Sequence, residues 1–384
     1  MTGSGGETSF MRRATSLAVA FVLVVLSSSF AVAQVDKSAN VRLLQTYRFN
    51  DKPFKIYKGA TDIAFHGRYA YVAGGAGLHI YDVTSRAPRE ISFISCPGSQ
   101  NDVAVVTPGL VALGYHESQC GALGGGITLI DVSDAARPRI RGSVEIGPSG
   151  AHTITTYPGK SLIYSSPGGN NPGNNRFETI VDTSDPDDPM IVGGQDVSLA
   201  GCHDLSFSFT RGRKLGFCAA GYTPATEIWD VSDPLAPEVI GRVASPLNSF
   251  HHSAVATPDG KFLGLSDENF ACAPTQGAIW FYDITDPGNP VLKSHFDMPL
   301  ERTDATNRYC TAHNFNFVPG TYKMVLSWYN SGMNVIDFSD PAAPKEIAHY
   351  TAPEVDYWST YFYAGRVFAS DTGRGLDVLE VKGL

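Results

Sequence analysis

Short runs of alternating apolar and polar residues recur along the chain and are separated by glycine, proline and other turn-forming residues. Alternation of this kind is typical of β-strands with one buried face. Within one stretch of the chain it predicts strands at 203–209, 214–219, 226–231 and 237–243. Four short strands in about 50 residues, named A to D in chain order, therefore form the unit from which the protein is built.

The unit is repeated, and its copies are easiest to see around one acidic residue. The stretch EIWDVSDPLAPEVIG at 227–241 returns as WFYDITDPGNPVLKS and NVIDFSDPAAPKEIA, and a degenerate copy, LDVLEVKGL, ends the chain. Seven units are recognised by their acidic anchors: Asp82, Asp131, Asp182, Asp230, Asp283, Asp337 and Glu380. Turn chemistry explains the motif, because Asp and Ser side chains cap turns and proline fixes the turn backbone. Seven copies of a four-stranded unit predict a seven-bladed β-propeller, in which each blade is one antiparallel sheet.

The last unit contains only three predicted strands, near 358–363, 366–369 and 376–381. A strand without a unit of its own is predicted at 40–49. Pairing of this N-terminal strand with the last blade would supply its fourth strand and leave no open sheet edge between the first and last blades. The sequence therefore predicts an all-β fold, with one propeller domain at 34–384.

Residues 1–33 are predicted to be a signal peptide rather than part of this fold. A charged segment with two arginines precedes an apolar run at 17–26, and Ala-Val-Ala at 31–33 fits a cleavage site. Met11 is an alternative start of the chain. The apolar run is too short to span a bilayer comfortably, so the mature protein is expected in the periplasm or outside the cell, without insertion in the membrane.

Composition and charge exclude several classes of partner and chemistry. The chain has a formal net charge of −9 and no basic run, which argues against binding to nucleic acid or anionic lipid. No phosphate-binding loop, dinucleotide-binding motif or serine-hydrolase elbow occurs, so no nucleotide cofactor is expected. Six cysteines without a Cys-x-x-Cys pair predict disulfides in an exported chain. From the loops and strands that carry them we expect three bridges: Cys96–Cys120, Cys202–Cys218 and Cys272–Cys310.

The repeated motif resembles a known family. The copies WDVSDP and YDITDP are similar to LVIVD repeats, which occur in exported bacterial and archaeal propellers, and the resemblance extends over essentially the whole mature chain. It implies the fold and says very little about activity. The single stretch YDITDPGNPVLKS also resembles, more weakly, the selenium-binding protein and methanethiol oxidase family, whose propellers are metal-dependent. That second resemblance rests on one blade motif and assigns no residue.

Aligning the A strands places a histidine at the first position of the strand in four successive units. These are His152, His203, His252 and His313, and the other units have Thr61, Asn101 and Trp358 there. Because the A strand is the innermost strand of a blade, the four imidazoles are expected to converge beside the central channel. Neutral imidazole is a common metal ligand, so we predict that they bind one transition metal ion, Fe, Cu, Mn or Zn. The alternative is a ring of polar strand caps that bond to backbone and water.

The loops of the same face add carboxylates, of which Glu268 is the candidate general base. The sequence leaves open whether five other side chains join the site: His116, Glu117, His251, Asp267 and Asp371. One hypothesis is an exported, metal-dependent oxidoreductase. With only three histidines bound, a zinc-bound water and Glu268 would instead make a hydrolase. The alternative is a non-catalytic propeller that binds a small molecule, a glycan or a protein on this face. Under either hypothesis we expect a monomer.

Overall fold

A computed structural model describes ten stretches of the chain, and the predicted signal peptide lies outside them. The described residues are 35–50, 58–121, 124–147, 150–167, 178–195, 201–221, 225–245, 247–270, 275–299 and 311–384. These residues form strands and turns and contain no helix. Accordingly, this part of the chain has no helix that could cross a membrane.

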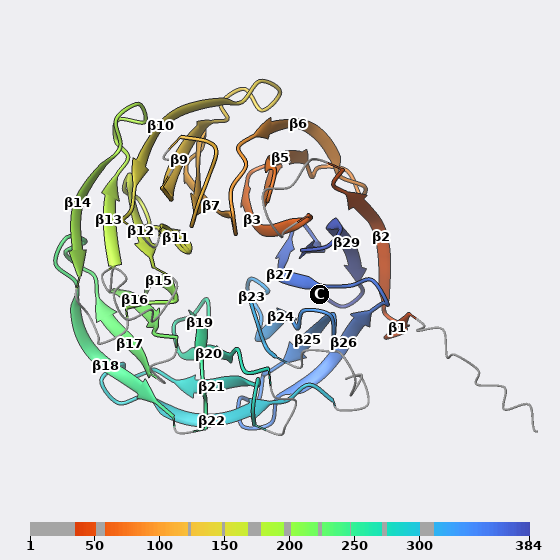
Figure 1. The fold of residues 1–384 in the computed structure, drawn as a ribbon. Helices are drawn as coiled ribbons and strands as arrows, with labels where there is room; N and C mark the ends of the chain where they lie inside the picture. The colour runs from red at the N-terminus through yellow and green to blue at the C-terminus, as the bar shows by residue number, and fades with distance from the viewer. Residues whose placement is uncertain are drawn as a thin grey trace, which may run out of the picture. The chain divides into compact units, whose positions relative to one another are not determined.

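The described residues form seven antiparallel sheets arranged in a ring, which confirms the predicted seven-bladed propeller (Figure 1). Blades 1 and 2 consist of β3 (Ala60–His66), β4 (Tyr69–Gly74), β5 (Gly77–Asp82), β6 (Arg89–Ser95), and then β7 (Asp102–Thr107), β8 (Leu110–Tyr115), β9 (Gly126–Asp131), β10 (Arg139–Glu145). Blades 3 and 4 consist of β11 (Thr153–Thr156), β12 (Leu162–Ser166), β13 (Glu178–Asp182), β14 (Met190–Gln195), and then β15 (Asp204–Thr210), β16 (Arg213–Ala219), β17 (Ala225–Asp230), β18 (Glu238–Ala244).

The remaining blades follow the same order, with the first strand of each nearest the centre of the ring (Figure 1). Blade 5 consists of β19 (His251–Ala256), β20 (Phe262–Asp267), β21 (Ile279–Asp283) and β22 (Val291–Phe296). Blades 6 and 7 consist of β23 (Phe315–Phe317), β24 (Lys323–Ser327), β25 (Met333–Asp337), β26 (Lys345–Thr351), and then β27 (Tyr357–Tyr363), β28 (Arg366–Asp371), β29 (Gly375–Val381). In blade 4, all four strands begin and end within one residue of the predicted positions.

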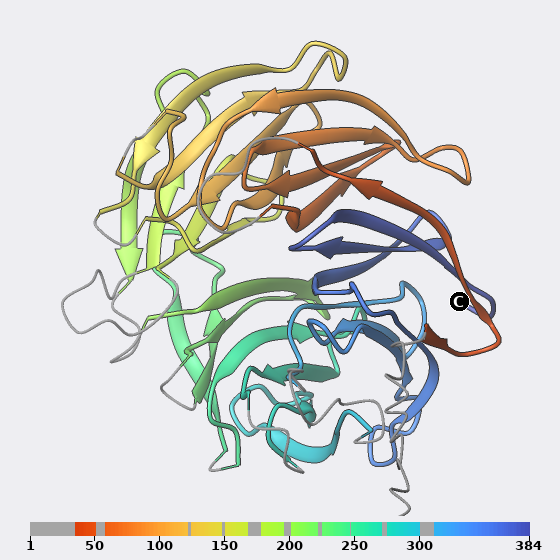
Figure 2. The same cartoon turned by 45° about the vertical axis from the view of Figure 1, so that its right-hand side comes forward.

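The N-terminal strand closes the ring. Strand β2 (Val41–Arg48) pairs with β29 in antiparallel register, from Val41 opposite Val381 to Arg48 opposite Gly375. Figure 2 shows this strand, in red, beside the blue strands of the last blade. The pairing confirms the closure predicted from residues 40–49. The sequence did not predict the short strand β1 (Asp36–Lys37), which adds to the outer edge of blade 6 by pairing with β26.

Hydrogen bonds inside the repeated turn explain why its acidic residues recur. The Asp230 carboxylate accepts the backbone N–H of Ser232 at 2.8 Å, and the Asp233 carboxylate accepts that of Leu235 at 3.0 Å. The first of these bonds recurs in the other five complete copies, on Asp82, Asp131, Asp182, Asp283 and Asp337. Side chains that satisfy turn N–H groups in this way shape the backbone, so the motif has the structural role predicted for it.

The same turn also joins neighbouring blades. The backbone N–H of Gly142 in blade 2 donates to the carbonyl of Pro186 in the turn of blade 3, at 2.7 Å. The hydroxyl of Ser294 in blade 5 donates to the carbonyl of Pro341 in the turn of blade 6, at 2.6 Å. These two turns therefore contact the outer strand of the blade before them, which couples the repeat motif to the spacing of the ring.

Two of the three predicted disulfides are present. Cys96 is bonded to Cys120, and Cys202 is bonded to Cys218 on the neighbouring strand. The third predicted bridge, Cys272–Cys310, lies outside the described residues. The Cys202–Cys218 bond ties the inner end of blade 4 directly beside His203.

Replacement of Asp230 by Asn tests the role of the turn carboxylates. Hydrogen bonds from Ser232 lower the pKa of Asp230, so its contribution to stability is present above the unfolded-state pKa and is lost as the pH falls. The free energy of unfolding of the parent should therefore fall more steeply than that of the variant between about pH 5 and pH 3. Urea unfolding across this range measures the difference.

Asp188→Asn is the matched control, because Asp188 lies in the equivalent turn of blade 3 with an exposed carboxylate that accepts no hydrogen bond from the described residues. Its unfolding curve should follow that of the parent at every pH. Equal pH dependence in the parent and Asp230→Asn would contradict the capping role.

Candidate metal site

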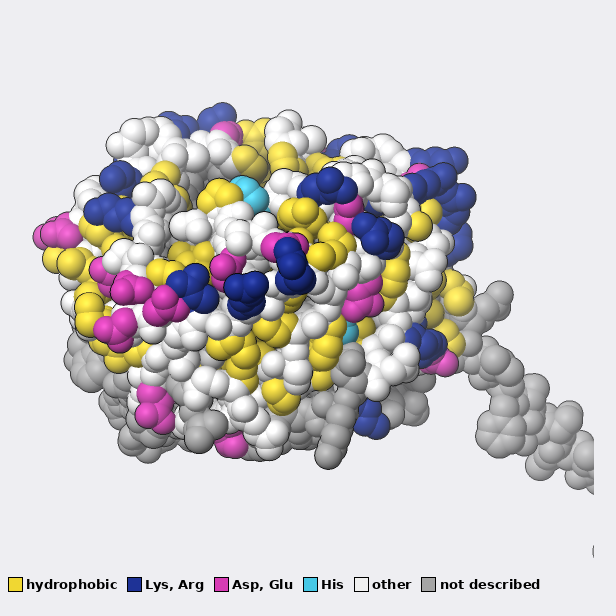
Figure 3. Space-filling model, turned by 90° about the horizontal axis from the view of Figure 1, so that it is seen from above, with side chains coloured by type: hydrophobic (Ala, Val, Ile, Leu, Met, Phe, Trp, Pro, Cys, Tyr) yellow, Lys and Arg dark blue, Asp and Glu magenta, His cyan; other side chains and the backbone are white. Residues whose placement is uncertain are grey.

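The structure brings the four aligned histidines together in an arc at the inner ends of blades 3 to 6. The ring centroids of His152 and His203 are 4.3 Å apart, those of His203 and His252 are 4.5 Å apart, and those of His252 and His313 are 4.0 Å apart. All four residues are at least nine-tenths buried. Figure 3 shows one side of the molecule, where charged and apolar side chains are mixed and histidine covers only small areas.

Backbone carbonyls of the next blade orient two of these imidazoles. Nδ1 of His203 lies 3.3 Å from the carbonyl oxygen of His252, and Nδ1 of His313 lies 2.5 Å from that of Trp358. A carbonyl only accepts hydrogen bonds, so each Nδ1 carries the proton and each Nε2 keeps its lone pair. This second contact is the usual way in which proteins hold a histidine ready to bind a metal through its other nitrogen.

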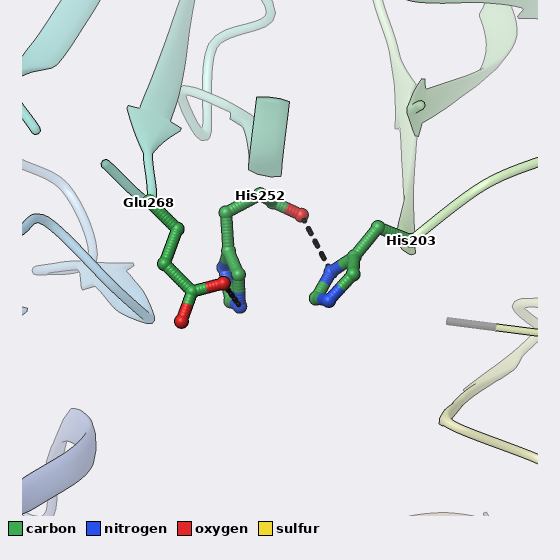
Figure 4. A group of neighbouring side chains, drawn as sticks. All are labelled: His203, His252 and Glu268. Carbon is green, nitrogen blue, oxygen red and sulfur yellow. Dashed lines mark hydrogen bonds and ion pairs between the residues drawn. The ribbon is translucent and has the colours of Figure 1, made fainter. Parts of the chain in front are cut away.

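Glu268 completes a compact set of donor atoms with two of the histidines. One donor atom from each of His203, His252 and Glu268 can be chosen so that all three lie within 4.8 Å of one another (Figure 4). Oε2 of Glu268 is 3.8 Å from Nε2 of His252, and Oε1 is 3.8 Å from Nε2 of His313. Glu268 follows β20 of blade 5, and His252 lies in β19 of the same blade. His203 comes from blade 4 and His313 from blade 6, so three neighbouring blades contribute to the site.

Burial keeps the imidazoles neutral. Loss of contact with water lowers the pKa of His203 to about 4 and that of His313 to about 3, and it lowers the pKa of His152 and His252 well below the ordinary range. Burial also raises the pKa of Glu268 to about 7, although a hydrogen bond from Tyr329 opposes the change. Neutral imidazoles can bind a cation at pH 7 without first releasing a proton.

Two imidazole nitrogens in the arc have no hydrogen-bond partner among the described residues. They are Nε2 of His313 and Nδ1 of His252, both of which are buried. Leaving a buried polar atom unpaired costs about 1–3 kcal/mol, so such atoms in a folded protein commonly indicate a ligand or a bound water. Nε2 of His313 faces the Glu268 carboxylate, where a metal ion would satisfy it.

Of the residues that the sequence left open, one extends the arc. Nε2 of His116 lies 2.8 Å from Nδ1 of His152, with ring centroids 5.0 Å apart. The adjacent Glu117 is exposed. His251 does not join the arc, although it adjoins His252, because its Nδ1 bonds to the hydroxyl of Thr226 at 2.8 Å.

The two remaining aspartates hold loops instead of facing the histidines. The Asp267 carboxylate accepts the backbone N–H groups of Phe250 at 2.8 Å and Gly277 at 3.1 Å. The Asp371 carboxylate accepts the backbone N–H of Asp356 at 2.9 Å and is paired with Arg374. Asp267 still matters to the site, because the loop that it holds places the Phe250 ring 4.9 Å from the ring of His203.

Sequence reasoning missed two features of the site. Tyr329 donates its hydroxyl hydrogen bond to Oε1 of Glu268 and packs its ring 4.4 Å from that of His313. A cavity that His152 and His252 line also contains the carboxylates of Asp62 and Asp102. Both aspartates occupy the second position of their A strands, so the alignment that found the histidines could have found them one residue further on. Nothing in the sequence near Tyr329 marks it in this way.

These observations define the chain as a seven-bladed β-propeller whose central channel is lined with histidine on the side of blades 3 to 6. The LVIVD repeat model matches residues 59–89 and 318–352, so the chain carries LVIVD repeats, as its motif indicated. A search of the curated proteins found no match.

Solved structures with the same fold include two propellers of low sequence identity. Sqt1 of Saccharomyces cerevisiae has a TM-score of 0.55 and 8% identity, with 85% of this chain and 84% of that chain covered. PpgL, a periplasmic gluconolactonase of Pseudomonas aeruginosa, has a TM-score of 0.57 and 12% identity, with 77% and 86% covered. At these identities the likeness extends to the fold alone.

The pH dependence of unfolding of the metal-free protein tests whether the histidines are buried in the neutral form. The unfolded chain takes up protons on histidine near pH 6.5, whereas His203 in the folded chain does so only at about pH 4. Stability is therefore lost as the pH falls from about 6.5 towards 4. Between pH 7.5 and 5, His203→Gln should lose about 2 kcal/mol less than the parent in urea unfolding.

His66→Gln serves as the control, because His66 is exposed on another face of blade 1. It should show the pH dependence of the parent. If His203→Gln also shows the pH dependence of the parent, then His203 takes up its proton equally in the folded and unfolded protein. That result would contradict a neutral, buried His203.

Proposed function

We propose that this chain is an exported metalloprotein that holds one transition metal ion at the centre of the propeller and acts as an oxidoreductase. The observation that carries the proposal is the convergence of His203, His252 and Glu268, whose donor atoms lie within 4.8 Å of one another. His313 is the fourth donor, through its buried Nε2, which has no hydrogen-bond partner in the described part of the chain. His152 lies beside His203, with ring centroids 4.3 Å apart, and is a further candidate donor.

The type of donor narrows the choice of ion. Two imidazoles and one carboxylate are the set that non-haem Fe(II) oxygenases use, and zinc hydrolases use a similar set. Calcium and magnesium prefer oxygen donors and fit poorly here. The fourth donor separates the remaining candidates, because four protein ligands fill a tetrahedral zinc ion. Iron, manganese and copper accept further ligands and keep a position for a substrate, which favours redox chemistry over hydrolysis.

Glu268 has two possible tasks in this arrangement. The sequence suggested a general base, whereas the 3.8 Å separation between its Oε2 and the Nε2 of His252 supports a metal ligand. Small side-chain rotations would bring these donors to the distance of about 2.0–2.2 Å at which zinc and similar ions are bound. As a ligand, the carboxylate also offsets one positive charge of the ion in a buried site.

Export is supported by chemistry as well as by the predicted signal at 1–33. Two disulfides join cysteines of the described residues, and such bonds persist in oxidising compartments. In the periplasm or outside the cell, the channel would also be accessible to small molecules that do not enter the cytoplasm. A substrate, or in the non-catalytic alternative a small-molecule, glycan or protein ligand, would reach the ion from the face that carries the B-to-C and D-to-A loops.

Elemental analysis of the purified mature protein tests the proposal. We expect about one equivalent of Fe, Mn or Cu in the parent, before or after loading with each ion in turn, because four neutral or anionic donors converge there. His203→Ala and Glu268→Gln should each lower the affinity for that ion by tenfold or more.

The exposed-histidine variant His66→Ala is the control and should retain the ion. Absence of any bound metal in the parent after loading would exclude a metalloprotein. It would favour the alternative, a non-catalytic propeller that binds a small molecule, a glycan or a protein. One equivalent of zinc with no affinity for the other ions would replace the oxidoreductase by a zinc hydrolase.

A further inference from the structure

Tyr329 occupies a constrained position beside the donor atoms. It lies between β24 and β25 of blade 6, in a loop of the same face as Glu268. Its backbone φ is +50°, in the left-handed region that a bulky residue seldom adopts. Two backbone hydrogen bonds with Tyr357, of 3.1 and 2.9 Å, hold it there. Uncommon backbone conformations that the surroundings enforce in this way cluster at functional sites.

The side chain of Tyr329 is directed at Glu268 and enclosed by aromatic rings. Its hydroxyl donates to Oε1 of Glu268. Its ring centroid lies 4.4 Å from that of His313 and 5.7 Å from that of Trp358, which it meets edge-on. Tyr329 is only 7% exposed, so packing on two sides leaves its hydroxyl little freedom to turn away from the carboxylate.

The two oxygens of Glu268 therefore have different surroundings. Oε1 accepts from Tyr329 and faces Nε2 of His313, whereas Oε2 faces Nε2 of His252. A carboxylate binds a metal ion through one oxygen or through both, and the second mode occupies an additional coordination position. A hydrogen bond to one oxygen favours binding through the other.

We infer that Tyr329 is a positioning residue that restricts Glu268 to binding through Oε2 and so keeps one coordination position of the ion open. The inference rests on the proposed metal site. The open position adjoins the neutral ring of His313 and Oε1 of Glu268, which already accepts the Tyr329 hydrogen bond. An anionic or oxygen-containing small molecule would bind there by supplying a donor atom to the ion. The hydroxyl also stabilises the ionised carboxylate, and it accordingly lowers the pKa that burial raises.

Azide binding to the Co²⁺-loaded protein tests this inference, because cobalt reports a change in coordination number through its visible spectrum. Tyr329→Phe removes the hydroxyl and keeps the ring against His313 and Trp358. The freed Oε1 should then occupy the open position, so the dissociation constant of azide should rise by about tenfold or more. Tyr329→Gln returns an N–H donor and should recover part of the loss.

Tyr363→Phe is the control, since the Tyr363 hydroxyl donates to the carbonyl of Gly67 away from the site. It should bind azide as the parent does. Thermal unfolding of each variant separates a loss of fold from a loss of positioning, and Tyr329→Gln provides a second variant should Tyr329→Phe fold poorly.

The outcomes distinguish this inference from the function beneath it. Unchanged azide affinity and an unchanged cobalt spectrum in Tyr329→Phe, with cobalt bound as in the parent, would overturn the role of Tyr329 and leave the metal site intact. A parent that binds no cobalt would overturn both. Weaker azide binding in Tyr329→Phe and partial recovery in Tyr329→Gln would support the inference.

Discussion

The pairing of β2 with β29 is the constraint on which the rest of the structure depends. Without it, blade 7 would lack its outer strand and the first and last blades would present open edges. The histidine arc depends on the same closure, because its members come from four blades and meet only when the blades stand around a common axis. Hydrogen bonds between repeat turns and the preceding blade, as at Pro186 and Pro341, help to set the spacing between blades.

Neutral imidazoles explain how so many titratable groups share one buried place. Four protonated histidines with centroids 4.0 to 4.5 Å apart would repel one another strongly at low dielectric. Burial removes that conflict by keeping the rings uncharged, and the carbonyls of His252 and Trp358 fix the position of two of the remaining protons. The arc therefore consists of uncharged imidazoles, and a metal ion requires this neutral state because it binds to a nitrogen lone pair.

The fold could be predicted because the signal is repeated and local. Alternation and turn chemistry recur in the six complete units, and the strands of blade 4 were placed within one residue. The histidines could be found because they share a position in the repeat. Tyr329 could not, because its role arises from a loop of blade 6 that reaches Glu268 of blade 5, and no periodicity records such a contact. Adjacency in the sequence is also a poor guide to membership of the site. His251 bonds to Thr226, whereas its neighbour His252 belongs to the arc.

Closure by the N-terminal strand also sets the order in which the blades and the ring can form. Strand β2 is made before the other strands of the seven blades and its partner β29 after them, so their contact closes a very long loop and carries a large entropic cost. Individual blades can form as they emerge, whereas the ring can close only after β29 has been made. A chain cut short before β29 would therefore contain its other blades without enclosing the channel.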